Sequence, residues 1–213
     1  MKRTTCTMGI VMLLWGSFPL FAQEINMGRL LEDENIEAIN RTIRLEEEAV
    51  MMDAQPSDGL GILKGISFEE GSIELDIKGA NKPGQSFVGL AFNIENDSTY
   101  EAVYFRPFNF VAEEPIRRAH MVQYIYHPAF PWYRLREERT GEFEHEIQPA
   151  PSPNDWFHVK LEITEKKVSV FVEGATSPVL EVARLSKPKT DILAIWTGFN
   201  SEGQFRNLKL KKK

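Results

Sequence analysis

Residues 156–172, WFHVKLEITEKKVSVFV, decide the fold of this chain. Apolar and polar residues alternate on both sides of the turn-forming pair Glu165-Lys166. Because side chains on a strand point to opposite faces in turn, this alternation gives each strand one apolar face. The apolar positions are Phe157, Val159, Leu161 and Ile163 before the turn, and Val168, Val170 and Val172 after it. The stretch predicts a β-hairpin that buries one face.

Short runs of the same kind, separated by turn residues, continue on both sides of this hairpin. Ile73, Leu75 and Ile77 alternate with polar residues in the same way. Further runs cover residues 87–94, 100–105, 180–183, 192–196 and 205–210. About ten to thirteen short strands with turns at close spacing are typical of an antiparallel sandwich. We therefore predict an all-β fold, a two-sheet antiparallel jelly-roll sandwich over residues 41–210, followed by a basic tail at 211–213.

Residues 24–58 do not alternate as clearly. Leu30, Leu31, Ile36 and Ile39 have a spacing that suits an amphipathic helix, but short strands would also fit these residues. We expect an N-terminal extension at residues 23–40 with a loop or short turn. The first strands are then expected near residues 41–45 and 50–53.

The N-terminus has the parts of a secretory signal peptide. Lys2 and Arg3 precede an apolar run from Met8 to Phe21, and Ala22 supplies a small residue for cleavage. This run is too short for a membrane-spanning helix. We expect residues 1–22 to be the signal peptide, and the mature chain to be exported to the periplasm or the extracellular space without a membrane anchor.

The composition excludes several classes of protein. The single cysteine, Cys6, lies in the predicted signal peptide, so the mature chain has no thiol for a disulfide, a nucleophile or a metal site. The formal net charge is −6, and removal of Lys2 and Arg3 makes the chain more acidic. Because an acidic chain repels phosphate backbones, we expect no nucleic-acid partner. We also expect no cofactor.

Residues 100–136 concentrate aromatic, guanidinium and amide side chains. An aromatic ring offers a rigid platform for a sugar ring, and guanidinium and amide groups bond to its hydroxyls. Pro107 ends a strand, and Pro128 and Pro131 stiffen the predicted loop at residues 127–136. The solvated face of any β-sandwich has a similar composition. The conspicuous residues are Tyr104, Arg106, Asn109, Gln123, His127, Trp132, Tyr133, Arg134 and Arg136.

Several segments resemble concanavalin A-like domains, the superfamily of lectins, laminin G-like domains and glucanases. They include FEEGSIELDIKG at 68–79, WFHVKLEI at 156–163 and GFNSEGQFRNLKL at 198–210. The chain looks most like exported bacterial domains related to the 3-keto-disaccharide hydrolase family. The resemblance, over about residues 62–210, implies a jelly roll whose concave face or rim loops bind carbohydrate. The ligand-binding residues that it implies are Arg106, Asn109, Gln123, Trp132 and Arg136.

Two acidic groups are weaker candidates for catalysis. Glu74 and Asp76 share one face of a strand, and a retaining glycoside hydrolase needs two carboxylates close together. The glucanases of this superfamily carry Glu-x-Asp-x-x-Glu, however, and no third acid follows here. The second group is an acidic segment around His145, which suits acid–base chemistry but suits a charged sheet edge better. Its acids are Glu142, Glu144 and Glu146.

A turn at residues 93–97, NIEND, has enough side-chain oxygens for Ca²⁺. Asn and Asp also favour turns without any metal, and we expect no metal site.

We therefore predict an exported carbohydrate-recognition domain. The first alternative is a glycoside hydrolase of the 3-keto-disaccharide hydrolase kind. It requires a titratable carboxylate in the same cleft, with Glu101, Glu142 or Glu144 within reach of Arg106 and Gln123. The second alternative is a protein-interaction domain, which requires a flat apolar patch.

Overall fold

The computed structural model describes residues 22–213, and the predicted signal peptide at 1–22 lies outside the described residues except for Ala22. No helix in the described part is long and apolar enough to cross a bilayer. The elements are β1 (Gln23–Ile25), α1 (Met27–Glu32), β2 (Ile36–Ile39), β3 (Ile43–Glu46), β4 (Ala49–Met52), β5 (Gly59–Ser67), β6 (Gly71–Lys78), β7 (Val88–Asn96), β8 (Thr99–Phe105), the 3₁₀ helix η1 (Pro107–Asn109), α2 (Pro115–Arg118), β9 (Val122–His127), α3 (Trp132–Glu138), β10 (Glu144–His145), β11 (Trp156–Ile163), β12 (Lys167–Val172), β13 (Leu180–Ala183), β14 (Ile192–Thr197) and β15 (Gly203–Lys212).

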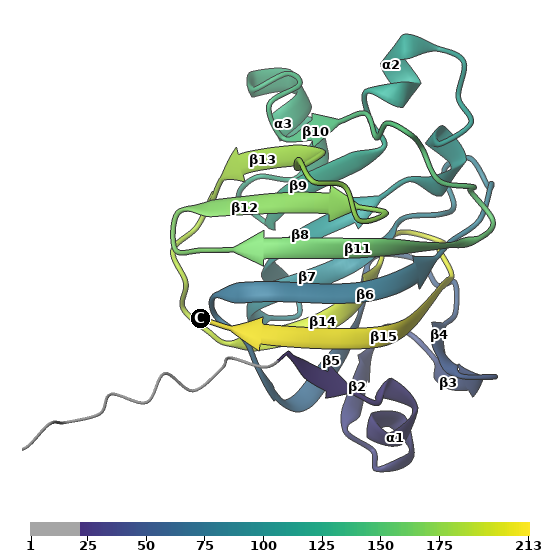
Figure 1. Cartoon of the computed structure of the whole chain (residues 1–213), viewed down its shortest axis with the longest axis vertical. Helices are drawn as coiled ribbons and strands as arrows, with labels where there is room; N and C mark the ends of the chain where they lie inside the picture. Colours follow the sequence, from purple (N-terminus) through teal and green to yellow (C-terminus); the bar gives the residue numbers. More distant parts are fainter. Residues whose placement is uncertain (1–21) are drawn as a thin grey trace, which may run out of the picture.

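The strands form two antiparallel sheets that pack face to face (Figure 1). The eight-stranded sheet, in front in Figure 1, has the order β13-β12-β11-β6-β15-β4-β3, with β1 beside the end of β15. The seven-stranded sheet behind it has the order β10-β9-β8-β7-β14-β5-β2. This arrangement confirms the predicted all-β, two-sheet antiparallel sandwich.

The core lies between the two sheets and is built by the alternating positions. β11 and β12 form the predicted hairpin, in which Val159 lies opposite Val172. On the other side of β11, Phe157 lies opposite Ile77 of β6, and both are buried. The ring of Phe105, from β8 in the other sheet, meets the Phe157 ring edge-on at 5.2 Å between centroids. The apolar faces predicted for these strands therefore meet in one interior.

The N-terminal segment is part of the sandwich. β1 pairs with β15, β2 pairs with β5, and α1 begins after Asn26, whose side chain accepts a hydrogen bond from the Arg29 amide at 2.9 Å. The expectation that strands begin near residue 41 is therefore wrong, although β3 and β4 do lie near the predicted positions. β1 and β2 have only three and four residues, too few to show a period of two. Lys211 and Lys212, placed in the predicted tail, belong to β15.

One buried ion pair ties the β13–β14 connection to the interior. Glu101 points inward from β8 and accepts hydrogen bonds from Arg184 Nη2 at 2.6 Å and Nε at 3.1 Å. The Tyr124 hydroxyl and the Asn93 amide also donate to this carboxylate. Asn93 reaches it because a bulge in β7 gives Asn93 a left-handed backbone, with φ of 50°. Every lone-pair region of the carboxylate therefore faces a donor, as a buried charge requires.

Replacement of Arg184 by Met should destabilise the fold strongly. The change leaves the Glu101 carboxylate buried without a cation, which costs about 3–5 kcal/mol of unfolding free energy. Urea denaturation measures this loss. Lys189→Met is the matched control, because Lys189 lies in the same connection and pairs with Glu95 at the surface. It should cost less than about 1 kcal/mol. Equal losses in the two variants would contradict the role given to the Glu101–Arg184 pair.

Candidate functional site

One row of residues across the seven-stranded sheet contains Tyr104 and Trp196, which form the floor of a cleft. The register places Gln123 of β9 opposite Tyr104 of β8, Tyr104 opposite Gly89 of β7, and Gly89 opposite Trp196 of β14. Tyr104 points away from the core because its neighbour Phe105 points into it. Gly89 has no side chain, so the rings of Tyr104 and Trp196 meet above it with centroids 5.0 Å apart.

The floor is held by hydrogen bonds along its length. The Trp196 indole Nε1 donates to the Tyr100 hydroxyl at 3.2 Å, and that hydroxyl donates to Asp58 Oδ2 at 2.9 Å. Tyr100 and Tyr104 lie on the same face of β8 with Ala102 between them, and the Trp196 side chain contacts both tyrosines. Burial raises the pKa of Tyr100 well above its usual value, and the neighbouring Asp58 carboxylate raises it further. The phenol therefore remains a donor.

The cleft has a volume of about 550 Å³, which suits a small ligand. It opens on the face of the seven-stranded sheet that points away from the eight-stranded sheet. Trp132 and Phe199 line the cleft and are 45% and 54% exposed, so each offers an aromatic face to solvent. Phe87, Phe108 and Ile125 add apolar surface. The polar lining is supplied mainly by Asp58, Arg106, Asn109, Arg117, His120, His127 and Arg136.

A buried carboxylate, Glu144 of β10, organises one wall of the cleft. Arg136 of α3 binds it with both Nε, at 2.9 Å, and Nη2, at 2.7 Å. His120 Nε2 lies 3.2 Å from its Oε1, and Arg106 Nη1 lies 3.9 Å from its Oε2. Burial lowers the pKa of His120, Glu144 opposes this shift, and Arg136 and Arg106 add to it. Two guanidinium groups and a neutral imidazole therefore surround one carboxylate.

Arg106 is itself held from several directions. Its Nη2 donates to the Tyr104 hydroxyl at 2.7 Å and to Gln123 Oε1, and its Nη1 donates to the His120 carbonyl at 3.0 Å. The Tyr104 hydroxyl also donates to Gln123 Oε1, at 2.9 Å. Burial raises the pKa of Tyr104 to about 12, which keeps the phenol protonated. The guanidinium therefore has a fixed orientation at the cleft wall.

Four of the five predicted ligand-binding residues line this cleft: Arg106, Asn109, Trp132 and Arg136. The fifth, Gln123, is buried beside the cleft and does not line it, and its carbonyl oxygen holds Arg106 and Tyr104. Its amide nitrogen Nε2 is buried and has no hydrogen-bond partner among the described residues. Gln123 therefore positions Arg106 instead of facing the cleft.

The predicted loop at residues 127–136 is wrong in its second half, where α3 begins at Trp132. One helical turn separates Trp132 from Arg136, so their side chains lie on the same face of the helix. The Arg136 guanidinium lies 5.0 Å from the centre of the Trp132 ring. The run of good helix formers from Arg134 to Glu138 is the sequence signal for this helix.

Several lining residues were not among the predicted site residues. Trp196 belongs to a predicted strand, and its outward position follows from the alternation with Ile195. Asp58, Arg117 and Phe199 come from three connections that are far apart in the sequence. No periodic pattern marks residues in such connections, so the sequence gives no signal that brings them together.

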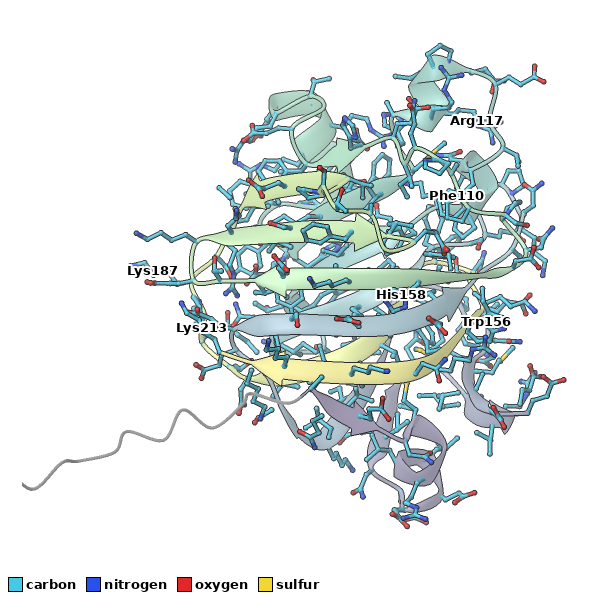
Figure 2. The ribbon with its side chains drawn as sticks, viewed as in Figure 1. Phe110, Arg117, Trp156, His158, Lys187 and Lys213 are labelled. Carbon is cyan, nitrogen blue, oxygen red and sulfur yellow. The ribbon has the colours of Figure 1, made fainter. Side chains whose placement is uncertain are left out.

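The pair Glu74 and Asp76 lies on the outer face of the other sheet, away from the cleft (Figure 2, near the labelled His158). The His158 ring lies between the two carboxylates, with Nδ1 2.9 Å from Asp76 and Nε2 3.6 Å from Glu74. Burial would raise the pKa of Asp76, but hydrogen bonds from His158 and Asn207 hold it below its usual value. The pair therefore belongs to a charged network, in which Asp76 also lies 3.5 Å from Arg206 Nε.

The acidic segment around His145 divides between two environments. Glu142 pairs with Arg139 and Glu146 pairs with Arg118, both at the surface, whereas Glu144 is buried beside the cleft. Side chains alternate between the two faces of β10. Glu144 therefore reaches the cleft wall, and its neighbour His145 does not.

Two side chains of the turn at residues 93–97 are bound to other groups of the protein. The side-chain oxygen of Asn93 accepts from the Lys189 and Thr190 amides, and Glu95 pairs with Lys189 Nζ at 2.8 Å. Within residues 22–213, no group of three or more His, Cys, Asp or Glu side chains is placed to hold a metal ion.

Comparison with solved structures gives the same fold for several carbohydrate-related proteins. No family model matches the sequence, and no curated protein matches it. The carbohydrate-binding module CBM66 from Bacillus subtilis superposes with a TM-score of 0.60 at 13% identity, covering 82% of this chain and 93% of the module. The exoplasmic/lumenal domain of VIP36, in its Ca²⁺/Man3GlcNAc-bound form, gives 0.56 at 10% identity over 84% of both chains. A protein described as a native glycosidic hydrolase gives 0.56 at 9% identity, covering 91% of this chain and 97% of its own. The chain has the fold of concanavalin A-like domains.

Replacement of Gly89 by Ala should disturb the cleft floor and the fold together. A Cβ at this position would lie 2.1 Å from the Val103 carbonyl oxygen and 2.7 Å from Tyr104 Cα, both in the backbone of β8. Such overpacking costs about 1–3 kcal/mol of unfolding free energy. Gly28→Ala is the control, since its Cβ would meet side-chain atoms and no backbone, with Leu45 Cδ1 at 3.3 Å and Asn26 Oδ1 at 3.4 Å. If urea denaturation showed equal stability for the two variants, the close approach at Gly89 would be refuted.

The cleft histidines should make the stability depend on pH. Burial lowers the pKa of His127 and of His120, with Asp58 and Glu144 respectively opposing the shift. A lowered pKa means that the folded chain binds fewer protons than the unfolded chain, so the unfolding free energy falls as pH falls through the ordinary histidine pKa of about 6.5. His127→Gln should lose less stability than the wild type between about pH 7.5 and about pH 5.5. Urea denaturation at the two pH values measures this difference. If the wild type and His127→Gln lost the same unfolding free energy, His127 would not contribute to the pH dependence of stability.

Proposed function

We propose that the protein is an exported carbohydrate-binding domain and that the cleft on its seven-stranded sheet holds a saccharide. The observation that carries this proposal is the exposure of Trp132 and Phe199 at a cleft whose wall presents Arg106 and Arg136. Aromatic faces beside fixed guanidinium groups match the two kinds of surface on a sugar ring. The predicted signal peptide supports export.

The contacts of Trp132 support its role as a stacking platform. Its ring is packed edge-on against Tyr133 at 5.8 Å and lies beside the Arg136 guanidinium, which Glu144 fixes in turn. A side chain whose orientation is already fixed loses little entropy when a ligand binds. The ring therefore offers a preorganised apolar surface at the cleft mouth.

The similar folds agree with this proposal. CBM66 is described as a carbohydrate-binding module, and the VIP36 domain is described as bound to Man3GlcNAc. At 13% and 10% identity these structures share the fold with this chain, so the proposal rests on the cleft.

The geometry favours binding over glycoside hydrolysis. A two-carboxylate mechanism needs an acid and a second carboxylate on either side of the scissile bond. Of the described residues that line the cleft, Asp58 alone carries a carboxylate, and Tyr100 donates to it. Glu144 lies behind the wall with both oxygens bound by Arg136. The concave and partly charged lining also differs from the flat apolar patch of a protein-interaction surface.

Trp132→Ala should weaken saccharide binding by about 1–3 kcal/mol, because the stacking surface is lost. The ring is half exposed, so the melting temperature should change little. Trp156→Ala is the matched control, since Trp156 has the same ring and is partly exposed but lies in β11 of the other sheet and does not line the cleft. Calorimetric titration with saccharides that raise the melting temperature of the wild type measures both variants.

The same titrated mixtures should be examined for products. Recovery of intact saccharide, with weakened binding in Trp132→Ala alone, is the expected result for a binding domain. Release of product would make the protein a glycoside-active enzyme. Unchanged binding in Trp132→Ala would place the saccharide elsewhere.

A further inference from the structure

The cleft has an excess of positive charge, although the whole chain is acidic. Three arginines line it, Arg106, Arg117 and Arg136, and we name them the arginine wall. The formal net charge of the chain is −6, so this wall contrasts with the rest of the molecule. Local excess of one sign in a concave site attracts ligands of the opposite sign.

At the buried wall of the cleft, positively charged side chains outnumber negatively charged ones. Arg106 and Arg136 share the single carboxylate of Glu144, and His120 adds no negative charge. Burial lowers the pKa of Arg106 and the neighbouring Arg136 lowers it further, whereas Tyr104 and Glu144 oppose this shift. A buried positive charge without a full counter-ion is unfavourable, and an anionic ligand at this wall would relieve it.

Arg117 of α2 is the member of the wall with the most freedom to turn toward a ligand (labelled in Figure 2). Its hydrogen bonds to Asn109 Oδ1 and to the Phe108 carbonyl are long, both 3.3 Å. Its carboxylate partner, Glu114, lies 3.6 Å away and is 60% exposed, where solvent screens the pair. A ligand carboxylate would replace weak contacts with charge-assisted ones.

The cleft also has few acceptors for the hydroxyls of a neutral sugar. Each hydroxyl is a donor as well as an acceptor, so a neutral sugar needs acceptors on the protein. Among the lining side chains, the carboxylate and amide acceptors are Asp58, whose Oδ2 accepts from Tyr100, and Asn109, beside three guanidinium groups. A ligand that is itself rich in acceptors fits this donor-rich wall better.

We propose that the saccharide held by the cleft is acidic and that its carboxylate, as in a uronic acid, binds the arginine wall. This inference rests on the proposed function and narrows it to one class of saccharide. The planar fork of a guanidinium matches a carboxylate with two parallel hydrogen bonds, which is the reason for choosing a carboxylate over a sulfate.

The test compares each acidic probe with its own neutral ester. Trimers of galacturonate, glucuronate and mannuronate are titrated calorimetrically into the protein without its predicted signal peptide, and so are their methyl esters and a panel of neutral and sulfated oligosaccharides. At least one uronate should bind about tenfold or more tightly than its methyl ester at low salt. The difference should shrink as salt is added.

Adjacent arginines on α2 supply matched variants. Arg117→Gln should raise the Kd of the uronate about tenfold and leave the Kd of its ester unchanged. Arg118→Gln removes the same charge one residue away, from a side chain that pairs with Glu146 at 2.9 Å and does not line the cleft. It should leave both Kd values unchanged.

The other outcomes separate this inference from the proposed function. Equal affinity for acid and ester, equal effects of the two variants, or binding confined to neutral sugars would overturn the acidic ligand and retain a saccharide site. Binding of a sulfated oligosaccharide without any uronate would overturn the choice of a carboxylate. Absence of binding to every saccharide would overturn the proposed function as well.

Discussion

The alternation of side chains along the strands of the seven-stranded sheet is the constraint on which the rest of the structure depends. Its inward positions are committed to the core, as the contact between Phe105 and Phe157 shows. The outward positions on the same strands are therefore the places where a site can be built. Tyr104 and Trp196 occupy two of these positions, and Gly89 between them lets their rings meet and close the floor.

The polar chemistry of this sheet depends on two buried carboxylates on opposite faces. Glu101 points inward and fixes the β13–β14 connection through Arg184. Glu144 points outward and fixes Arg136 and the neighbouring Arg106 at the cleft wall. The Glu101 carboxylate pairs with one guanidinium, that of Arg184, whereas the Glu144 carboxylate is shared by the guanidinium groups of Arg136 and Arg106. This difference separates a structural ion pair from a wall that can still accept an anion.

Much of the fold could be predicted from the sequence, because strands with one buried face carry a period of two. This period of two is lost in strands that are buried on both faces and in segments that are not strands. Gln123 could not be placed on a face because β9 is buried on both, as Tyr124 and Ile125 show. The sequence predicts a loop where the short helix α3 begins at Trp132, because prolines precede it. Residues from separate connections, such as Phe199, meet in the cleft only through the tertiary fold.

The most direct test of the cleft is the indole region of a nitrogen-15 proton correlation spectrum during saccharide titration. Residues 22–213 contain three tryptophans, of which Trp132 and Trp196 line the cleft. Trp156 lies in the other sheet, with the Arg206 guanidinium 4.1 Å from the centre of its ring (Figure 2). The account predicts that a bound saccharide shifts the Trp132 and Trp196 indole signals and leaves that of Trp156 in place. A shift of Trp156 alone would contradict it and place the saccharide on the eight-stranded sheet.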